Sequence, residues 1–183
     1  MLLRTGIFGG SFNPIHSGHI AIGEYFHRSG ILDEVWFVVS PQNPLKTSEV
    51  SLNAEERLQA CREVLKDYPY LTVSDIEFEL PRPSYMAQTL KSLQERYPDR
   101  QFSLIIGGDN LAHFERWKDY RQILDNYDIL VYPRPGSPNI VPENWKRVRL
   151  FEDATLMDIS STQIREQQKL AREQQAKQTT LEL

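Results

Sequence analysis

Two histidines lie near the start of the chain, in the stretch GIFGGSFNPIHSGH at residues 6–19. His16 and His19 are three residues apart and flank Gly18, where an apolar run gives way to glycine and proline. Histidines at this spacing, at the start of a helix, can both donate a ring N–H group to one phosphate. The first amides of a helix and the positive end of its dipole also attract anions. The spacing therefore predicts a phosphate-binding turn.

The glycines of this stretch do not form either of two common nucleotide-binding motifs. Gly9 and Gly10 follow the first predicted strand directly, where missing side chains let a ligand approach the backbone. No G-x-G-x-x-G pattern passes through them and no Gly-Lys-Ser/Thr follows, so the dinucleotide fingerprint and the P-loop are excluded. The alternative interpretation is a turn with one exposed and one structural histidine. A zinc site would need a third ligand, and none lies nearby in the sequence.

A second polar cluster, DISSTQIRE, lies at residues 158–166. Ser160 and Gln163 have the spacing of a capping box, which predicts a helix that begins at Ser160. The amides and hydroxyls of the next two residues, with a guanidinium one turn later, would then form a polyphosphate site. These groups belong to Ser161, Thr162 and Arg165. A capped surface helix is the alternative, and it leaves these three residues unexplained.

Three further candidates are weaker when taken singly. GGDN, at residues 107–110, follows a buried apolar run and offers close backbone approach and the Asp109 carboxylate for ribose hydroxyls. Lys46 follows the second predicted strand and could pair with a phosphate. Trp117 could stack on an aromatic ring or pack in the core. Each of them also has a purely structural interpretation.

Alternating apolar and amphipathic segments predict the scaffold that must position these groups. Strands are expected at residues 2–8, 34–40, 102–106, 127–132 and 147–151, with a short extended piece at 71–79. Helices are expected from Gly18, after a capping box at Asn53 and Glu56, over residues 86–97, and from Ser160. This alternation predicts an α/β fold with a parallel sheet and helices on both faces. In such sheets ligands bind outside the carboxyl ends of the strands.

Length and composition fit one soluble domain over residues 1–183, with roughly the last dozen residues a frayed helical tail. Hydrophobic residues make up 40% and charged residues 25%, and no apolar run approaches a membrane span. We expect no membrane partner, and the formal net charge of -4 disfavours nucleic acid. The single cysteine, Cys61, shares a helical stripe with Leu58 and Leu65 and is expected to be a core thiol. With no signal peptide pattern, the expected location is cytoplasmic.

Both polar clusters resemble motifs of one superfamily. GGSFNPIHSGH resembles the G-G-x-F-D-P-x-H-x-G-H signature of the nucleotidyltransferases, and ISSTQIR resembles their I-S-S-T-x-I-R motif. Within the superfamily the chain is most similar to the nicotinate-nucleotide adenylyltransferases. His16 stands where phosphopantetheine adenylyltransferases usually carry threonine, and PRPSYMAQTL and IGGDNLAHFERW resemble two further family segments. The sequence departs from the family pattern at Asn13 (usually aspartate), Leu45 (in a Pro-His-Lys/Arg loop ending) and Met86 (commonly threonine).

The resemblance implies a Rossmann-like nucleotidyltransferase fold and adenylyl transfer from ATP to nicotinate mononucleotide, with release of pyrophosphate, in NAD biosynthesis. It assigns catalysis to His16, His19 and Arg165. It assigns ATP binding to Gly9, Gly10, Ser11, Phe12, Gly18, Gly107, Asp109, Ser161 and Thr162, and mononucleotide binding to Lys46, Tyr85, Thr89 and Trp117. Mg²⁺ would be carried by ATP, with no metal site in the protein. Alternatives are an enzyme that uses nicotinamide mononucleotide or both mononucleotides, and a non-catalytic nucleotide-binding protein on the same fold.

Overall fold

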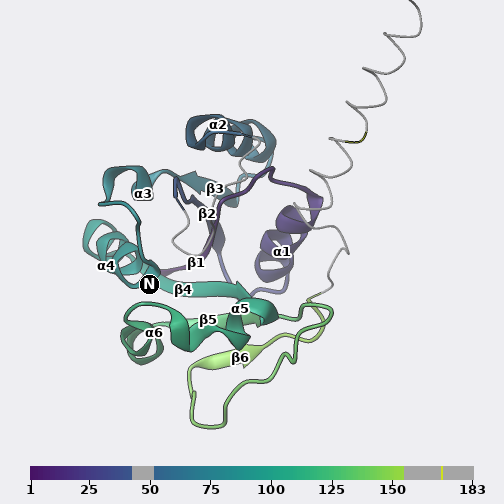
Figure 1. Cartoon of the computed structure of the whole chain (residues 1–183), viewed down its shortest axis with the longest axis vertical. Coiled ribbons are helices and arrows are strands. Elements are labelled where there is room, and N and C mark those ends of the chain that lie inside the picture. Colours follow the sequence, from purple (N-terminus) through teal and green to yellow (C-terminus); the bar gives the residue numbers. More distant parts are fainter. Residues whose placement is uncertain (43–51, 155–169, 171–183) are drawn as a thin grey trace, which may run out of the picture.

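The computed structural model describes residues 1–42, 52–154 and 170. Six parallel strands form one sheet in the order β3-β2-β1-β4-β5-β6 (Figure 1). The strands are β1 (Leu3–Gly10), β2 (Glu34–Val39), β3 (Leu71–Ser74), β4 (Arg100–Gly107), β5 (Asp128–Tyr132) and β6 (Val148–Leu150). The predicted parallel α/β sheet is confirmed, and its strand order is that of a Rossmann fold.

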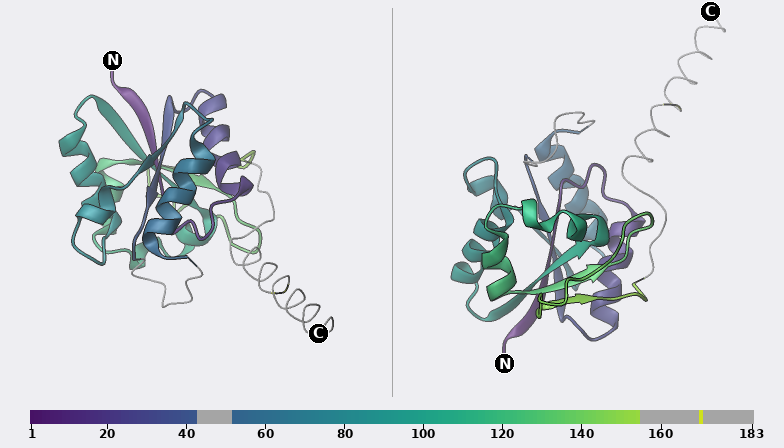
Figure 2. Two further views of the ribbon diagram at one scale, coloured as in Figure 1. Left: turned by 90° about the horizontal axis from the view of Figure 1, so that it is seen from above. Right: turned by 60° about the horizontal axis from the view of Figure 1, so that its bottom comes forward.

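Helices cover both faces of the sheet, as Figure 2 shows from two further sides. One face carries α1 (Ser17–Arg28) and α2 (Ala54–Leu65). The other carries α3 (Ile76–Glu79), α4 (Met86–Arg96), α5 (Gly108–Ala112), the 3₁₀ helix η1 (Phe114–Arg116) and α6 (Tyr120–Asn126). Within the described residues no helix combines the length and the apolar character that crossing a membrane requires.

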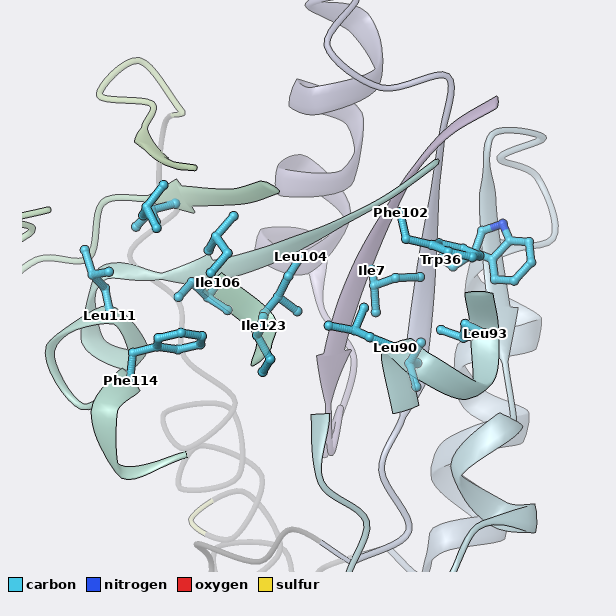
Figure 3. Packing of buried hydrophobic residues seen from close by; sticks show 14 of the residues in the cluster. Ile7, Trp36, Leu90, Leu93, Phe102, Leu104, Ile106, Leu111, Phe114 and Ile123 are labelled. Atoms are coloured by element: carbon cyan, nitrogen blue, oxygen red, sulfur yellow. The ribbon is translucent and has the colours of Figure 1, made fainter. Parts of the chain in front are cut away.

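Successive residues of the central strands belong to two different hydrophobic cores. Ile7 packs with the helices on the α4 side, where Figure 3 shows it near Leu90, whereas Phe8 packs in the core beneath α1. Side chains alternate between the faces of a strand, so a strand with helices on both sides buries apolar side chains on both faces. This burial explains the short apolar runs that identified the central strands in the sequence.

Several local predictions are confirmed. Asn53 caps α2 by accepting a hydrogen bond from the Glu56 amide at 2.8 Å, and the Glu56 carboxylate accepts from the Asn53 amide in return. Cys61 is fully buried, and burial raises the pKa of its thiol to about 12, which fits a packed thiol and not a nucleophile. The helix predicted from Ser160 lies outside the described residues.

Two predicted boundaries are wrong. Gly9 and Gly10 do not follow β1 but are its last two residues, because they still pair with Val38 and Val39 of β2. Residues 71–79 are not one extended piece, since β3 ends at Ser74 and α3 follows it. The turn into α3 carries Glu77 into the interior, where two hydroxyl groups donate to its carboxylate.

Candidate active site

The chain changes direction in the sheet between β1 and β4, which are neighbours. After β1 it enters α1 on one face, and after β4 it enters α5 on the other. In a parallel sheet, connections that diverge in this way leave a crevice outside the carboxyl ends of the strands. The predicted histidine turn follows β1, and the GGDN segment spans the last residue of β4 and the start of α5. The topology therefore places both segments at this crevice.

The two histidines of the first turn cap α1 reciprocally. His16 is the N-cap residue, and its Nδ1 accepts a hydrogen bond from the Gly18 amide at 3.1 Å. Nδ1 of His19 accepts from the His16 amide, also at 3.1 Å, and the two rings stack with centroids 3.8 Å apart. A neutral imidazole whose Nδ1 accepts must carry its proton on Nε2. The cap therefore fixes two adjacent rings with Nε2–H as the donor of each.

Two neighbours that were predicted to bind ATP take part in this arrangement, and their contact with ATP stays a prediction. The Gly18 amide donates to the His16 ring in the cap. The Phe12 ring is buried, with its centroid 5.0 Å from that of His19. The Phe12 backbone adopts the left-handed region, at φ 48°, which directs the ring into the core. Phe12 therefore supports the His19 ring from behind.

His16 is held in its neutral form. Burial lowers the pKa of its imidazole below the ordinary value of 6.5, and the positive charge of Arg134 lowers it further. Arg134 follows β5 and lies 3.9 Å from the Asp109 carboxylate, measured from Nε to Oδ1. Arg134 is not among the site residues predicted from the sequence. The neutral state is the one that the helix cap requires, because a protonated Nδ1 cannot accept.

We expect His16→Asn to remove a pH dependence of stability that the wild type shows. Because the folded state favours the neutral imidazole of His16, the contribution of this group to the free energy of unfolding is complete above pH 6.5. It is lost as the pH falls through the lowered pKa that His16 has in the folded state. Asparagine keeps a cap acceptor but does not titrate. Urea unfolding between pH 5 and 8 should show the wild type losing stability faster than the variant below pH 6.5. Parallel curves for the two proteins would contradict this assignment.

A cavity of about 160 Å³ lies on the α4 side of the glycine pair. Four residues of its wall, Gly9, Gly10, Tyr85 and Trp117, were predicted site residues. Sequence reasoning assigned no binding role to the others, which are Ser40, Glu77, Ser84, Met86, Asn110, Arg116 and Lys118. The Trp117 ring both packs on Phe114, at 5.0 Å between centroids, and lines the cavity. The core contact is therefore present, and stacking on a ligand ring stays a prediction.

The glycine pair separates this cavity from the histidines. A Cβ atom on Gly9 would lie 2.6 Å from Cε of Met86 in the cavity wall. A Cβ atom on Gly10 would instead lie 3.3 Å from the ring of Phe12, which supports His19. The two positions face opposite sides, as successive strand residues must. A ligand that reaches both the cavity and the histidines would cross these two glycines.

Thr89 does not line the cavity directly. It is fully buried, and its hydroxyl donates to Oε1 of Glu77 at 2.9 Å. Ser84 donates to Oε2 of the same carboxylate at 2.8 Å, and Glu77 itself is 4% exposed and lines the cavity. Thr89 thus contacts a residue of the cavity wall and is not part of that wall itself. No local pattern in the sequence distinguishes Glu77 from an exposed carboxylate.

The end of β4 is closely packed around the predicted adenosine residues. A Cβ atom on Gly107 would lie 2.5 Å from Oδ1 of Asp109, so only glycine fits there without displacing that carboxylate. Lys46, Ser161, Thr162 and Arg165 lie outside the described residues. Among the residues that the structure describes, no group of three or more His, Cys, Asp or Glu side chains could hold a metal ion.

Comparison with known proteins identifies the family of this chain. A family model described as cytidylyltransferase-like matches residues 7–167. A relative from Bacteroides thetaiotaomicron, named "Probable nicotinate-nucleotide adenylyltransferase", is 50% identical over 167 residues, covering 90% of this chain and 81% of the relative. This chain belongs to the nicotinate-nucleotide adenylyltransferase family. A family member of the same name from Cytophaga hutchinsonii is 47% identical over 163 residues, covering 89% of this chain and 84% of that protein.

The fold is also found in solved structures. The nicotinic acid mononucleotide adenylyltransferase of Plasmodium falciparum complexed with NaAD matches with a TM-score of 0.73 at 17% identity, covering 90% of this chain and 83% of that one. The predicted Rossmann-like nucleotidyltransferase fold is therefore confirmed, as is the family resemblance drawn from the two motifs.

Proposed function

We propose that this protein transfers the adenylyl group of ATP to nicotinate mononucleotide, giving nicotinate adenine dinucleotide and pyrophosphate in cytoplasmic NAD biosynthesis. The observation that carries the proposal is the reciprocal cap, which fixes the Nε2–H donors of His16 and His19 beside a glycine pair and an aromatic cavity. The names of the relatives support the choice of substrate. So does the fold shared with an adenylyltransferase complexed with NaAD.

The proposed reaction needs no nucleophile from the protein. An oxygen of the mononucleotide phosphate attacks the α-phosphorus of ATP, a new P–O bond forms, and the bond to the β-phosphate breaks. This phosphate is already ionised at neutral pH, so catalysis consists of positioning the reactants and stabilising charge. His16 and His19 donate to the ATP phosphates and stabilise the charge that develops at the α-phosphorus.

The remaining ATP contacts follow from the predicted motifs. Ser161, Thr162 and Arg165 hold the β- and γ-phosphates as they leave. Gly107 and Asp109 contact the adenosine at the end of β4. Mg²⁺ enters as part of the substrate, since it binds readily to a triphosphate and keeps several waters.

The cavity is proposed to hold the mononucleotide. Tyr85 is the N-cap residue of α4 and provides no side-chain cap, so the first amides of this helix can donate to a carboxylate. Lys118 lies with Nζ 4.8 Å from the centroid of the Tyr85 ring, and Arg116 is a second cation in the wall. Trp117 provides a face for the pyridine ring, and Lys46 binds the mononucleotide phosphate. These donors and cations favour nicotinate over the uncharged nicotinamide.

A paired substrate assay tests this proposal. We expect kcat/KM for nicotinate mononucleotide to exceed that for nicotinamide mononucleotide, with pyrophosphate release as the readout. Equal or reversed values would favour an enzyme for nicotinamide mononucleotide or for both substrates. ATP binding without turnover of either mononucleotide would favour a non-catalytic nucleotide-binding protein.

Trp117→Ala should raise KM for the mononucleotide about tenfold, since ring stacking on an aromatic side chain contributes roughly 1–3 kcal/mol. KM for ATP should change little, because Trp117 lies on the cavity side of the glycine pair. Trp117→Phe keeps a ring and is the matched control, with a smaller increase. An equal rise of both KM values in Trp117→Ala would show that the residue acts through the fold and not through stacking.

A further inference from the structure

A buried arginine joins the loops that follow β1 and β2. Arg57, in the first turns of α2, is 3% exposed. Its Nη1 donates to the carbonyl oxygens of Ser11 and Ser40, the second at 2.8 Å, and its Nη2 donates to the carbonyl of Pro41 at 3.1 Å. One guanidinium group therefore bridges two chain segments that are separated by nearly thirty residues in the sequence.

These contacts begin where the sheet ends. The last backbone hydrogen bond between the two strands runs from the Ser40 amide to the Gly10 carbonyl at 2.8 Å. Beyond this hydrogen bond, the carbonyls of Ser11 and Ser40 accept from Arg57. The planar fork of a guanidinium suits this role, since it offers several donors in fixed directions. Arg57 thus extends the connection between β1 and β2 beyond the sheet.

Within residues 1–42 and 52–154, Arg57 has no acidic partner. No carboxylate of these residues forms an ion pair with it, and its Nε is buried without an acceptor there. Burial accordingly lowers the pKa of the guanidinium. A buried charge held only by carbonyl groups is costly for stability. An apolar side chain at this position could anchor α2 without burying a charge. Holding several carbonyl groups at once, in contrast, needs the several N–H donors of a planar guanidinium.

We propose that Arg57 is a positioning residue that sets the separation of the two halves of the site, an inference that rests on the proposed adenylyl transfer. Ser11 precedes Phe12, whose ring supports His19 on the ATP side. Ser40 lines the cavity on the mononucleotide side. A change in the distance between Ser11 and Ser40 therefore moves the histidines relative to the cavity. Misplacement of two reacting groups lowers the rate of the bound complex more than it weakens either substrate's binding.

The test compares Arg57→Lys with the wild type and with Leu65→Ala. Lysine keeps the charge but cannot hold three carbonyls with a planar fork. Leu65 is buried at the other end of the same helix, roughly two turns from Arg57, and provides a variant of reduced stability. We expect Arg57→Lys to lower kcat about tenfold, with each KM changed less than threefold. Leu65→Ala should lower the melting temperature at least as much while kcat per folded molecule stays unchanged.

A second readout does not depend on activity. Amide exchange at Ser40 should become faster in Arg57→Lys and remain as in the wild type in Leu65→Ala, relative to global unfolding. If Arg57→Lys leaves both kcat and the rate of Ser40 amide exchange unchanged, the positioning role of Arg57 is overturned. Turnover by the wild type in the same experiment would still support the proposed function. Absence of wild-type turnover would instead overturn the proposed function, and the exchange result would still decide whether Arg57 fixes the two loops.

Discussion

Replacement of His19 by alanine is expected to lower kcat by roughly 10²–10³-fold, the usual effect of removing one preorganised donor to a developing charge. ATP affinity should fall much less, because the phosphates keep their other proposed contacts. The loss has a second component in this protein, since Nδ1 of His19 accepts the His16 amide in the cap of α1. Losing this hydrogen bond should destabilise the fold by about 1 kcal/mol. Steady-state kinetics, ATP titration and urea unfolding of the same samples measure the three effects.

His19→Gln separates catalysis from capping. Glutamine at the third position of a helix can accept from the N-cap amide, as in a regular capping box. This variant should regain most of the stability lost in His19→Ala but should not regain kcat. A His19→Ala protein that keeps kcat within about threefold of the wild type would remove the histidine from the mechanism. Recovery of kcat in His19→Gln would show that the cap, and not the imidazole, matters.

Gly108→Ala should destabilise the fold by about 2 kcal/mol, although alanine is a better helix former than glycine. A Cβ atom on Gly108, the first residue of α5, would lie 1.8 Å from Oδ1 of Asn139. Asn139 cannot easily withdraw, because its side chain makes three hydrogen bonds, two to Arg134 and one to Ser137. Urea unfolding at pH 7 measures the change.

A double-mutant cycle identifies the cause of this loss. Asn139 has a φ of 51°, so glycine can replace it without backbone strain, at the expense of its three hydrogen bonds. In the Asn139→Gly background the collision is gone, and Gly108→Ala should be neutral or stabilising. A second loss of about 2 kcal/mol in that background would contradict the collision and point to the backbone of Gly108 instead.

Much of the fold could be predicted because its signals are local. The central strands carry short apolar runs, since cores lie on both of their faces, and Asn53 with Glu56 marks the start of α2 within four residues. The exact end of β1 could not be predicted in this way. It depends on pairing with β2, which carries the strand through Gly9 and Gly10.

In the candidate site, too, the residues that could be predicted are those with a local signal in the sequence. The spacing of His16 and His19 predicted a turn at the start of a helix, at which phosphate binding stays a prediction. The same spacing could have indicated their reciprocal cap, because it is that of a capping box. Glu77 and Arg57 resemble exposed charges in the sequence. Their burial depends on partners elsewhere in the chain, which are hydroxyls for Glu77 and strand-end carbonyls for Arg57. Such groups become recognisable only when the fold brings the partners together.

The most direct test of the proposed reaction follows the α-phosphorus of ATP. With ATP labelled at this position, the label should appear in nicotinate adenine dinucleotide, in an amount equal to the pyrophosphate released. Without nicotinate mononucleotide, neither product should form. Pyrophosphate release in the absence of the mononucleotide, or label recovered as AMP in its presence, would contradict direct attack of the mononucleotide phosphate on a histidine-held ATP.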